Sequence, residues 1–165
     1  MDDFFLETLQ QELTTDEDER LHVYDDATGR PIKAGDKVQG HATIGVGRNL
    51  ESRGISHAVS QMLLREDIDV AVADLNRNLP WWVDLSDRRR LALINMCFNL
   101  GWPRLSGFRK MLAALQDARD LEKAGSLDRA RASYSRAGDE ALDSKWARDV
   151  GPARSGRIAD YLREG

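Results

Sequence analysis

The sequence has a single cysteine and no uninterrupted apolar run long enough to cross a bilayer. Cys97 cannot form an internal disulfide, and its place in an apolar helical pattern predicts a buried small hydrophobic residue. The longest apolar run, residues 91–98, is interrupted by Asn95 and is far shorter than the ~20 residues that a membrane helix needs. Residues 1–6 lack the basic and apolar regions of a secretory signal, so we expect the chain to fold in a cytoplasm.

Common catalytic and metal-binding motifs are also missing. His22, His41 and His57 do not have the His-Glu-x-x-His spacing of a zinc protease, and one cysteine does not make a zinc site. Gly45 and Gly47 lack the third glycine of a dinucleotide-binding loop, and there is no Gly-x-Ser-x-Gly nucleophile elbow. Carboxylates remain as the residues most able to carry chemistry.

Charge is unevenly distributed along the chain, whose formal net charge is −4. Residues 1–85 contain 8 Lys+Arg against 17 Asp+Glu, whereas residues 86–165 contain 16 against 11. A basic second half predicts contact with something anionic. Nucleic acid, an anionic cell-wall polymer and the acidic half of the chain itself all meet that description.

Apolar residues recur at helical spacing over most of the chain. Residues 3–15 predict a short amphipathic helix, whereas residues 25–47, dense in glycine with interleaved Val, Ile and Thr, predict a small antiparallel sheet. Ser56 and Ser86 stand where they would cap the helices that follow them. Helices are predicted over residues 57–79, 87–100, 107–124, 127–137, 139–149 and 153–163, with the last four separated by breaks at Gly125, Gly138, Gly151 and Pro152. The pattern indicates an α+β fold that is mainly α.

Two carboxylates flank the start of the predicted sheet. Glu17 lies in the acidic cluster 16–19, and Asp26 follows nine residues later at the first turn. Hydrolysis of a glycosidic bond needs an acid to protonate the leaving oxygen and a carboxylate to steer water or stabilise the transition state. A solvated acidic turn explains the same cluster without any function.

Three stretches in order resemble the phage lysozymes, the bilobed muramidases of bacteriophages. The first runs from Glu17 through Tyr24-Asp25-Asp26 to residues 43–50. The second covers residues 89–101 with Gly107-Phe108, and the third covers residues 144–147 with 151–154 and Arg157. The resemblance implies a lysozyme-like fold in which a small sheet lobe is joined by a long helix to a helical lobe. It implies no metal and no organic cofactor.

The same resemblance assigns roles to site residues. Glu17 matches the catalytic glutamate, Asp26 the second acidic residue, and Thr43 the threonine that helps to hold the attacking water. The family implies an inverting mechanism, for which the two carboxyl groups are expected to lie about 6.5–9.5 Å apart. Arg48 and Asn99 are expected to contribute to substrate binding, Arg48 by pairing with an active-site carboxylate, although a capping or core hydrogen bond explains Asn99 equally well.

Two features depart from the family pattern. Asp18 stands where glycine often follows the catalytic glutamate, and it predicts a different ending for the first helix. Residues 27–42 enlarge the hairpin between Asp26 and Thr43, and we expect them to form a longer loop over the cleft.

We expect one lysozyme domain over residues 1–165, with a sheet lobe over about 14–56, a linking helix over 57–79 and a helical lobe over 80–165. Residues 1–13 are expected to pack on the helical lobe. The resemblance further implies a monomeric endolysin that lyses bacterial cells at the end of phage infection. It would act on peptidoglycan from the host cytoplasm after a holin-type protein permeabilises the membrane.

Other interpretations remain open from the sequence. A non-catalytic wall-binding or virion protein would retain the fold without hydrolysis, although it has no need of Glu17, Asp26 and Thr43 together. Hydrolysis of a related glycan such as chitin is a third possibility. A nucleic-acid binder is disfavoured, because the chain shows no recognised binding motif and is acidic overall.

Overall fold

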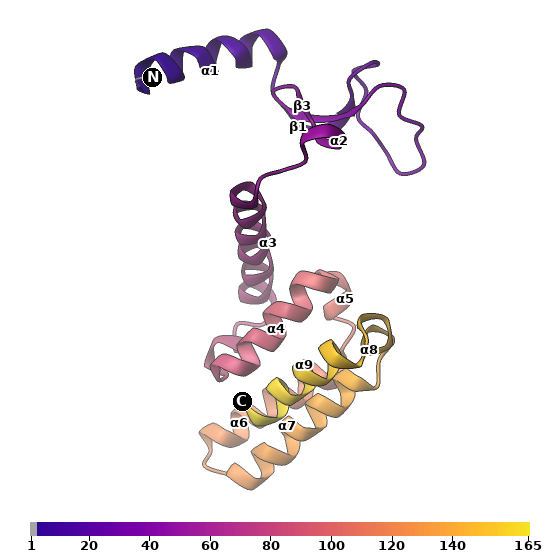
Figure 1. Ribbon diagram of the computed structural model, residues 1–165. Helices are drawn as coiled ribbons and strands as arrows, with labels where there is room; N and C mark the ends of the chain where they lie inside the picture. Colours follow the sequence, from indigo (N-terminus) through magenta and orange to yellow (C-terminus); the bar gives the residue numbers. More distant parts are fainter. Residues whose placement is uncertain (1–2) are drawn as a thin grey trace. The chain divides into compact units, whose positions relative to one another are not determined.

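The computed structural model describes residues 3–165, which begin with the helix α1 (Asp3–Glu17) (Figure 1). This helix extends two residues beyond the predicted 3–15, so that Glu17 is its last residue. None of residues 3–17 is buried within the described chain. The helix therefore places Glu17 at the point where the chain enters the sheet.

Contacts divide the chain into two compact units, one ending at Gln61 and the other beginning at Met62. The boundary falls within α3 (His57–Asn78), the long helix that the sequence predicts over 57–79. The expected packing of residues 1–13 on the helical lobe is a relation between the two units and stays a prediction; residues 1 and 2 lie outside the described residues.

The first unit contains a three-stranded antiparallel sheet, which confirms the predicted element, although two of its strands lie outside or at the edge of the predicted range 25–47. Its strands are β1 (Arg20–Asp25), β2 (Ala42–Gly45) and β3 (Arg48–Asn49), in the spatial order β1-β2-β3. The short helix α2 (Leu50–Arg53) follows directly, and the Asn49 side chain caps it by accepting a hydrogen bond of 2.9 Å from the Ser52 amide. Sheet and helix α2 are thus joined without a linker.

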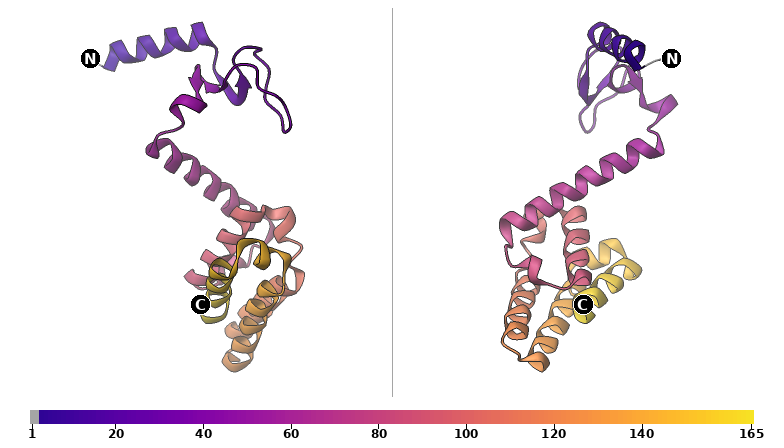
Figure 2. Two further views of the ribbon diagram at one scale, coloured as in Figure 1. Left: turned by 45° about the vertical axis from the view of Figure 1, so that its right-hand side comes forward. Right: turned by 90° about the vertical axis from the view of Figure 1, so that its left-hand side faces the viewer.

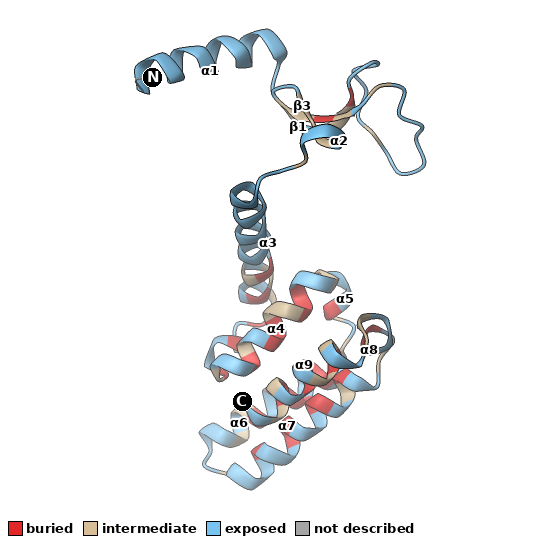
Figure 3. Ribbon diagram, viewed as in Figure 1, coloured by how far each residue is buried: buried red, intermediate tan, exposed pale blue. Residues whose placement is uncertain are grey.

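The second unit is helical, and its elements are the 3-10 turn η1 (Trp82–Asp84), α4 (Asp87–Leu100), α5 (Trp102–Leu105), α6 (Arg109–Lys123), α7 (Leu127–Leu142), α8 (Lys145–Val150) and α9 (Pro152–Glu164). Figure 2 shows α6 and α7 side by side, and both helices carry buried residues. Buried positions gather on the sides of the helices that face into this unit (Figure 3). Leu93, Met96 and Leu115 are fully buried in this core. Cys97 is buried among them, which confirms its predicted structural role.

The predicted helix break at Gly138 is wrong, because α7 continues through this position. A β-carbon on Gly138 would lie 2.7 Å from the Arg163 side chain and 2.9 Å from the Ala159 carbonyl oxygen. Glycine therefore allows α7 and α9 to approach closely, and this packing offsets its low helix propensity. The predicted helix over 139–149 is accordingly divided, and α8 begins after Ser144, whose hydroxyl caps it.

The two predicted serine caps differ in outcome. The Ser56 hydroxyl accepts a hydrogen bond of 3.3 Å from the Val59 amide, which confirms the cap of α3. Ser86 occupies the capping position of α4, but its hydroxyl accepts from the Arg89 guanidinium instead. Within residues 3–165, no helix combines the length and the apolar character that a membrane span requires.

Candidate active site

Glu17 is exposed at the C-terminal end of α1, where Asp18 turns the chain toward β1. Asp18 has a φ of 61°, the left-handed conformation that usually follows a helix end and favours glycine. Asp18 therefore ends the helix in a conformation that glycine adopts most readily, and the different ending expected from Asp18 stays a prediction. The result is a carboxylate held at the edge of the sheet unit.

The Glu17 carboxylate lies against the turn between β2 and β3. A β-carbon on Gly47 would stand 3.5 Å from Glu17 Oε2, and Gly47 itself has a φ of 68°. Glycine thus supplies the left-handed backbone of this turn, and it leaves no side chain beside the carboxylate. A bound ligand could approach Glu17 across this bare backbone.

Irregular pairing between β1 and β2 bends the sheet near the site. Arg20 pairs with Gly45 and Tyr24 with Thr43, so four steps along β1 correspond to two along β2. The extra residues form a bulge, which bends the strand and increases its local twist. Thr43 lies two positions before the end of β2, which leads into the turn beside Glu17.

Asp26 lies just beyond β1 and is bonded to the backbone of His41. Its carboxylate Oδ1 accepts a hydrogen bond of 2.7 Å from the His41 amide, and its own amide donates to the His41 carbonyl at 3.1 Å. The side chain remains exposed. These two bonds fix the orientation of a carboxylate that still faces solvent.

Thr43 is buried, and its hydroxyl donates to the same His41 carbonyl at 3.2 Å. A hydroxyl that donates its proton retains lone pairs that can accept from a water molecule. Asp26 and Thr43 therefore meet at one backbone position, although seventeen residues separate them in the sequence.

Asp25 is a buried carboxylate next to Asp26 in the chain, and no sequence pattern marked it as a site residue. It accepts hydrogen bonds from the amides of Gln39 at 2.7 Å, Gly40 at 3.0 Å and Ala27 at 3.0 Å. The Gln39 amide is the largest of the influences that lower the pKa of Asp25 below its ordinary value. An Asp that begins a glycine-rich loop at a strand end is a signal for such a turn.

His41 and Glu51 form a second pair that the sequence analysis did not find. His41 Nδ1 lies 3.0 Å from Glu51 Oε2, and Glu51 Oε1 accepts from the Ala42 amide at 3.3 Å. The hydrogen bond to Glu51 raises the pKa of His41, with a smaller contribution from the charge of Asp26. The same bond lowers the pKa of Glu51. Ten residues separate the pair, so only the folded β2–β3 hairpin brings it together.

Arg48 does not pair with an active-site carboxylate, and that prediction is wrong for the residues described. Its Nε donates to the Gly54 carbonyl at 2.6 Å, and Nη2 donates to the Arg53 carbonyl at 3.4 Å. Carbonyl groups at the end of a helix lack partners within it and attract cations, so α2 holds the guanidinium. A role of Arg48 in substrate binding stays a prediction.

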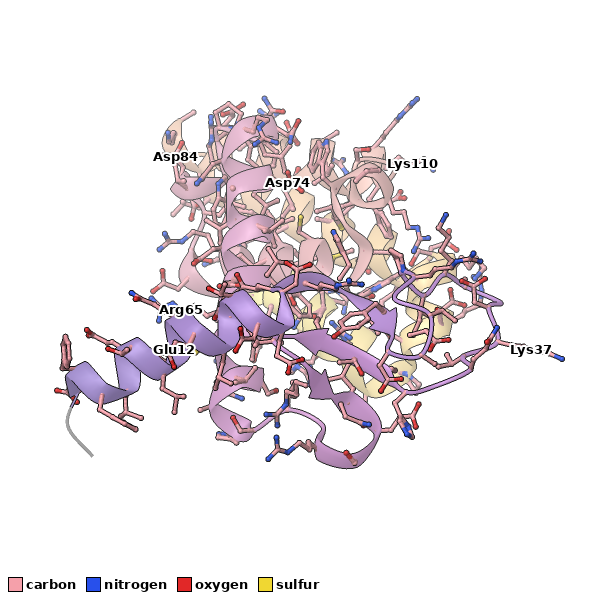
Figure 4. All side chains as sticks on the ribbon, turned by 90° about the horizontal axis from the view of Figure 1, so that it is seen from above. Glu12, Lys37, Arg65, Asp74, Asp84 and Lys110 are labelled. Atoms are coloured by element: carbon pink, nitrogen blue, oxygen red, sulfur yellow. The ribbon has the colours of Figure 1, made fainter. Side chains whose placement is uncertain are left out.

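Part of the enlarged hairpin extends the sheet. Tyr24 forms a bridge with Pro31, and the Ile32 amide donates to the Val23 carbonyl at 3.0 Å. These contacts lie along the edge of β1 that does not pair with β2, so this segment runs beside β1. Lys37 projects outward from the far part of the loop (Figure 4).

Asn99 belongs to the second unit, in α4. Its Oδ1 accepts a hydrogen bond of 2.8 Å from the Trp146 indole, which is the core hydrogen bond that the sequence analysis kept as an alternative. The two residues line a cavity of about 1080 Å³ together with Phe108 and Met111. The role of Asn99 in substrate binding is a prediction that this bond does not test.

Residues 17–146 match the family described as phage lysozyme. The match covers more than half of the 165 residues and begins at the carboxylate that lies beside the β2–β3 turn. It also includes Asp26, Thr43 and the whole sheet. The mainly helical architecture with its small antiparallel sheet agrees with a lysozyme-like fold. The chain therefore belongs to the phage lysozyme family, and this membership supports a role in the degradation of peptidoglycan.

Proposed function

We propose that the protein is a muramidase that hydrolyses the β-1,4 bond between N-acetylmuramic acid and N-acetylglucosamine, with Glu17 as general acid. Family membership supports the substrate class. The position of Glu17 supports the role, because its carboxylate is exposed beside the bare backbone of Gly47. A sugar lying on that surface would bring its bridging oxygen within reach of the acid.

The observation that carries the proposal is the convergence of Asp26 and Thr43 on the backbone of His41. A water molecule that donates its two hydrogens to a carboxylate and to a hydroxyl keeps a lone pair free for attack. The carboxylate can then accept the proton that the water loses. A protein that only binds glycan needs no such arrangement.

In the proposed reaction, Glu17 donates its proton to the bridging oxygen as the glycosidic bond breaks. Thr43 and Asp26 position water on the opposite face of the sugar, and Asp26 accepts the proton that this water loses. Attack from the opposite face inverts the anomeric carbon, and it requires room for water between carboxyl groups about 6.5–9.5 Å apart. We therefore propose an inverting outcome.

The cellular setting is part of the same proposal. Phage lysozymes degrade the host wall, so we propose an endolysin that waits in the host cytoplasm and reaches peptidoglycan once a holin-type protein has opened the membrane. Expression in Gram-negative cells is then expected to cause lysis only after the membrane is permeabilised, as followed by turbidity. Lysis without permeabilisation would contradict this setting while leaving the enzymatic activity in place.

The activity is tested by the release of reducing ends from purified peptidoglycan. Glu17→Gln is expected to lower the rate about 10²- to 10⁴-fold, the usual contribution of general acid catalysis. Glu12→Gln is the matched control, since Glu12 is an exposed acid on the same helix (Figure 4). Equal rates for wild type and Glu17→Gln would show that the acid is misassigned.

Two further measurements separate the remaining interpretations. Proton NMR of the first-formed anomer reports whether the product is inverted or retained. Binding of peptidoglycan without release of reducing ends would instead identify a wall-binding protein, and activity on chitin alone would move the substrate to a related glycan.

A further inference from the structure

We propose that His41 and Glu51 are positioning residues, which hold the start of β2 so that its backbone orients Asp26 and Thr43. The inference rests on the muramidase function proposed above and adds two residues to that site. Neither side chain needs to contact the substrate for this role.

The backbone of His41 is the shared partner of both reacting residues. Its amide donates to Asp26 Oδ1 at 2.7 Å, and its carbonyl accepts from the Thr43 hydroxyl at 3.2 Å. A shift of the peptide planes at this position would therefore move the carboxylate and the hydroxyl together. What holds His41 thus sets the geometry at which water is held.

His41 lies directly before β2, which begins at Ala42. Its backbone is bonded to Asp26 on one side. Glu51 adds a second restraint, because its two oxygens engage the His41 ring at 3.0 Å and the Ala42 amide at 3.3 Å. One carboxylate thereby spans two consecutive residues at the start of the strand.

Glu51 is itself firmly placed. It lies in α2, which begins directly after β3, and the Asn49 cap fixes the first turn of that helix. Asn49 also pairs with Thr43 across β2 and β3. The chain thus returns from Thr43 to Glu51 through regular structure and closes on His41.

The charges around His41 strengthen its bond to Glu51, because they favour the protonated ring. Glu51 faces its ring from α2, and Asp26 and Asp25 face it from the end of β1; all three favour the protonated imidazole. The raised pKa of His41 keeps the ring charged to a higher pH than a free histidine.

The exposure of the His41 and Glu51 side chains distinguishes a positioning role from a role in folding stability. The side chains of His41 and Glu51 are 57% and 53% exposed, and an exposed ion pair contributes little to the free energy of unfolding. Loss of the pair is therefore expected to lower kcat while the unfolding temperature hardly moves.

The test compares kcat and KM for reducing-end release by the full chain and four variants. His41→Ala and Glu51→Ala are each expected to lower kcat about 10-fold with little change in KM, because the reacting groups are displaced and the binding surface is not. The double variant is expected to lose no more than either single one, since both changes break one interaction. His22→Ala is the matched control, because His22 is an exposed histidine of the same sheet.

A conservative variant and a spectroscopic readout complete the test. His41→Gln retains a side-chain N–H that can donate to Glu51, so it is expected to recover most of the lost kcat. NMR titration of the wild type is expected to give a His41 pKa above 6.5 that falls in Glu51→Ala.

The outcomes distinguish the two proposals. Wild-type activity with His41→Ala matching His22→Ala would overturn the positioning role alone, as would single losses that multiply in the double variant. A wild type that releases no reducing ends would overturn the proposed function and this inference with it.

Discussion

Gly40 lies so close to Asp26 that a β-carbon at position 40 would overlap Asp26 Oδ1. The same β-carbon would stand 2.8 Å from the amide nitrogen and from the β-carbon of Ala27. Glycine at this position is therefore required for the Asp26 carboxylate to reach the His41 amide. Its backbone dihedral is not the reason, since Gly40 is not among the glycines with positive φ.

Gly40→Ala is accordingly expected to displace the Asp26 carboxylate and to lower kcat about 100-fold, the effect of moving a reacting group by about 1 Å. The measurement is the initial rate of reducing-end release at saturating peptidoglycan. Gly156→Ala is the control, because a β-carbon there would have no neighbour within 4 Å. Unchanged kcat in Gly40→Ala would show that the position of Asp26 is immaterial to the reaction.

The buried Asp25 carboxylate is expected to make the stability of the sheet unit depend on pH in the acid range. Its folded pKa is depressed, chiefly by the Gln39 amide, so its contribution to stability is present above the ordinary value of 3.8 and is lost as pH falls through the folded value. Asp25→Asn is therefore expected to lower the unfolding temperature at pH 6, and the difference from wild type should shrink below pH 3.8. Thermal melts from pH 2.5 to 6 measure this.

The comparison for Asp25 lies in the same loop. Asp36 is exposed and accepts one hydrogen bond, from the Lys33 amide at 2.8 Å. Because Asn retains an acceptor for a single amide, Asp36→Asn should leave the melts close to those of wild type. A gap between wild type and Asp25→Asn that stays constant with pH would contradict the role given to the Asp25 charge.

The sheet, the long helix and most of the helical unit could be predicted because their signals are local. Glycine density with β-branched residues marks residues 25–47, and helical periodicity gave 87–100 with the bounds that α4 has. Gly138 misled the prediction for the opposite reason. Its role is set by Arg163 and Ala159 of α9, which no local pattern reveals.

The resemblance to the family named candidate site residues, but it did not name the residues that support them. Glu17, Asp26 and Thr43 follow from the family pattern, whereas Asp25, His41 and Glu51 act through partners brought to them by the fold. The expected pairing of Arg48 with an active-site carboxylate was wrong, because backbone carbonyls at the end of α2 bind its guanidinium instead. Contacts between a strand and a helix end depend on register, and sequence spacing alone does not fix it.

Substitutions at Asp18 test whether the backbone at the end of the helix that carries Glu17 is strained. With a φ of 61°, Asp18 adopts a conformation that Asp and Asn tolerate better than other non-glycine residues, and that β-branched residues avoid. Asp18→Val is expected to reduce the free energy of unfolding by about 1–2 kcal/mol, whereas Asp18→Asn should be nearly neutral. Urea unfolding followed by circular dichroism measures both. Equal stability of the two variants would mean that this backbone is not strained.

Arg89 tests the core of the helical unit, where it is buried. Its guanidinium donates to the carbonyls of Leu162 and Arg163, both at 3.1 Å, and lies 3.3 Å from the centre of the Tyr134 ring. Burial lowers the pKa of Arg89 below its ordinary value. Lysine offers one ammonium in place of the planar guanidinium, and leaving buried carbonyls without a donor costs about 1–3 kcal/mol each.

Arg89→Lys is therefore expected to lower the free energy of unfolding, measured with urea, by about 1–3 kcal/mol. Arg88→Lys, at an exposed neighbour, should change stability by less than about 0.5 kcal/mol. Similar losses at both positions would mean that the geometry of the guanidinium is not what the core requires.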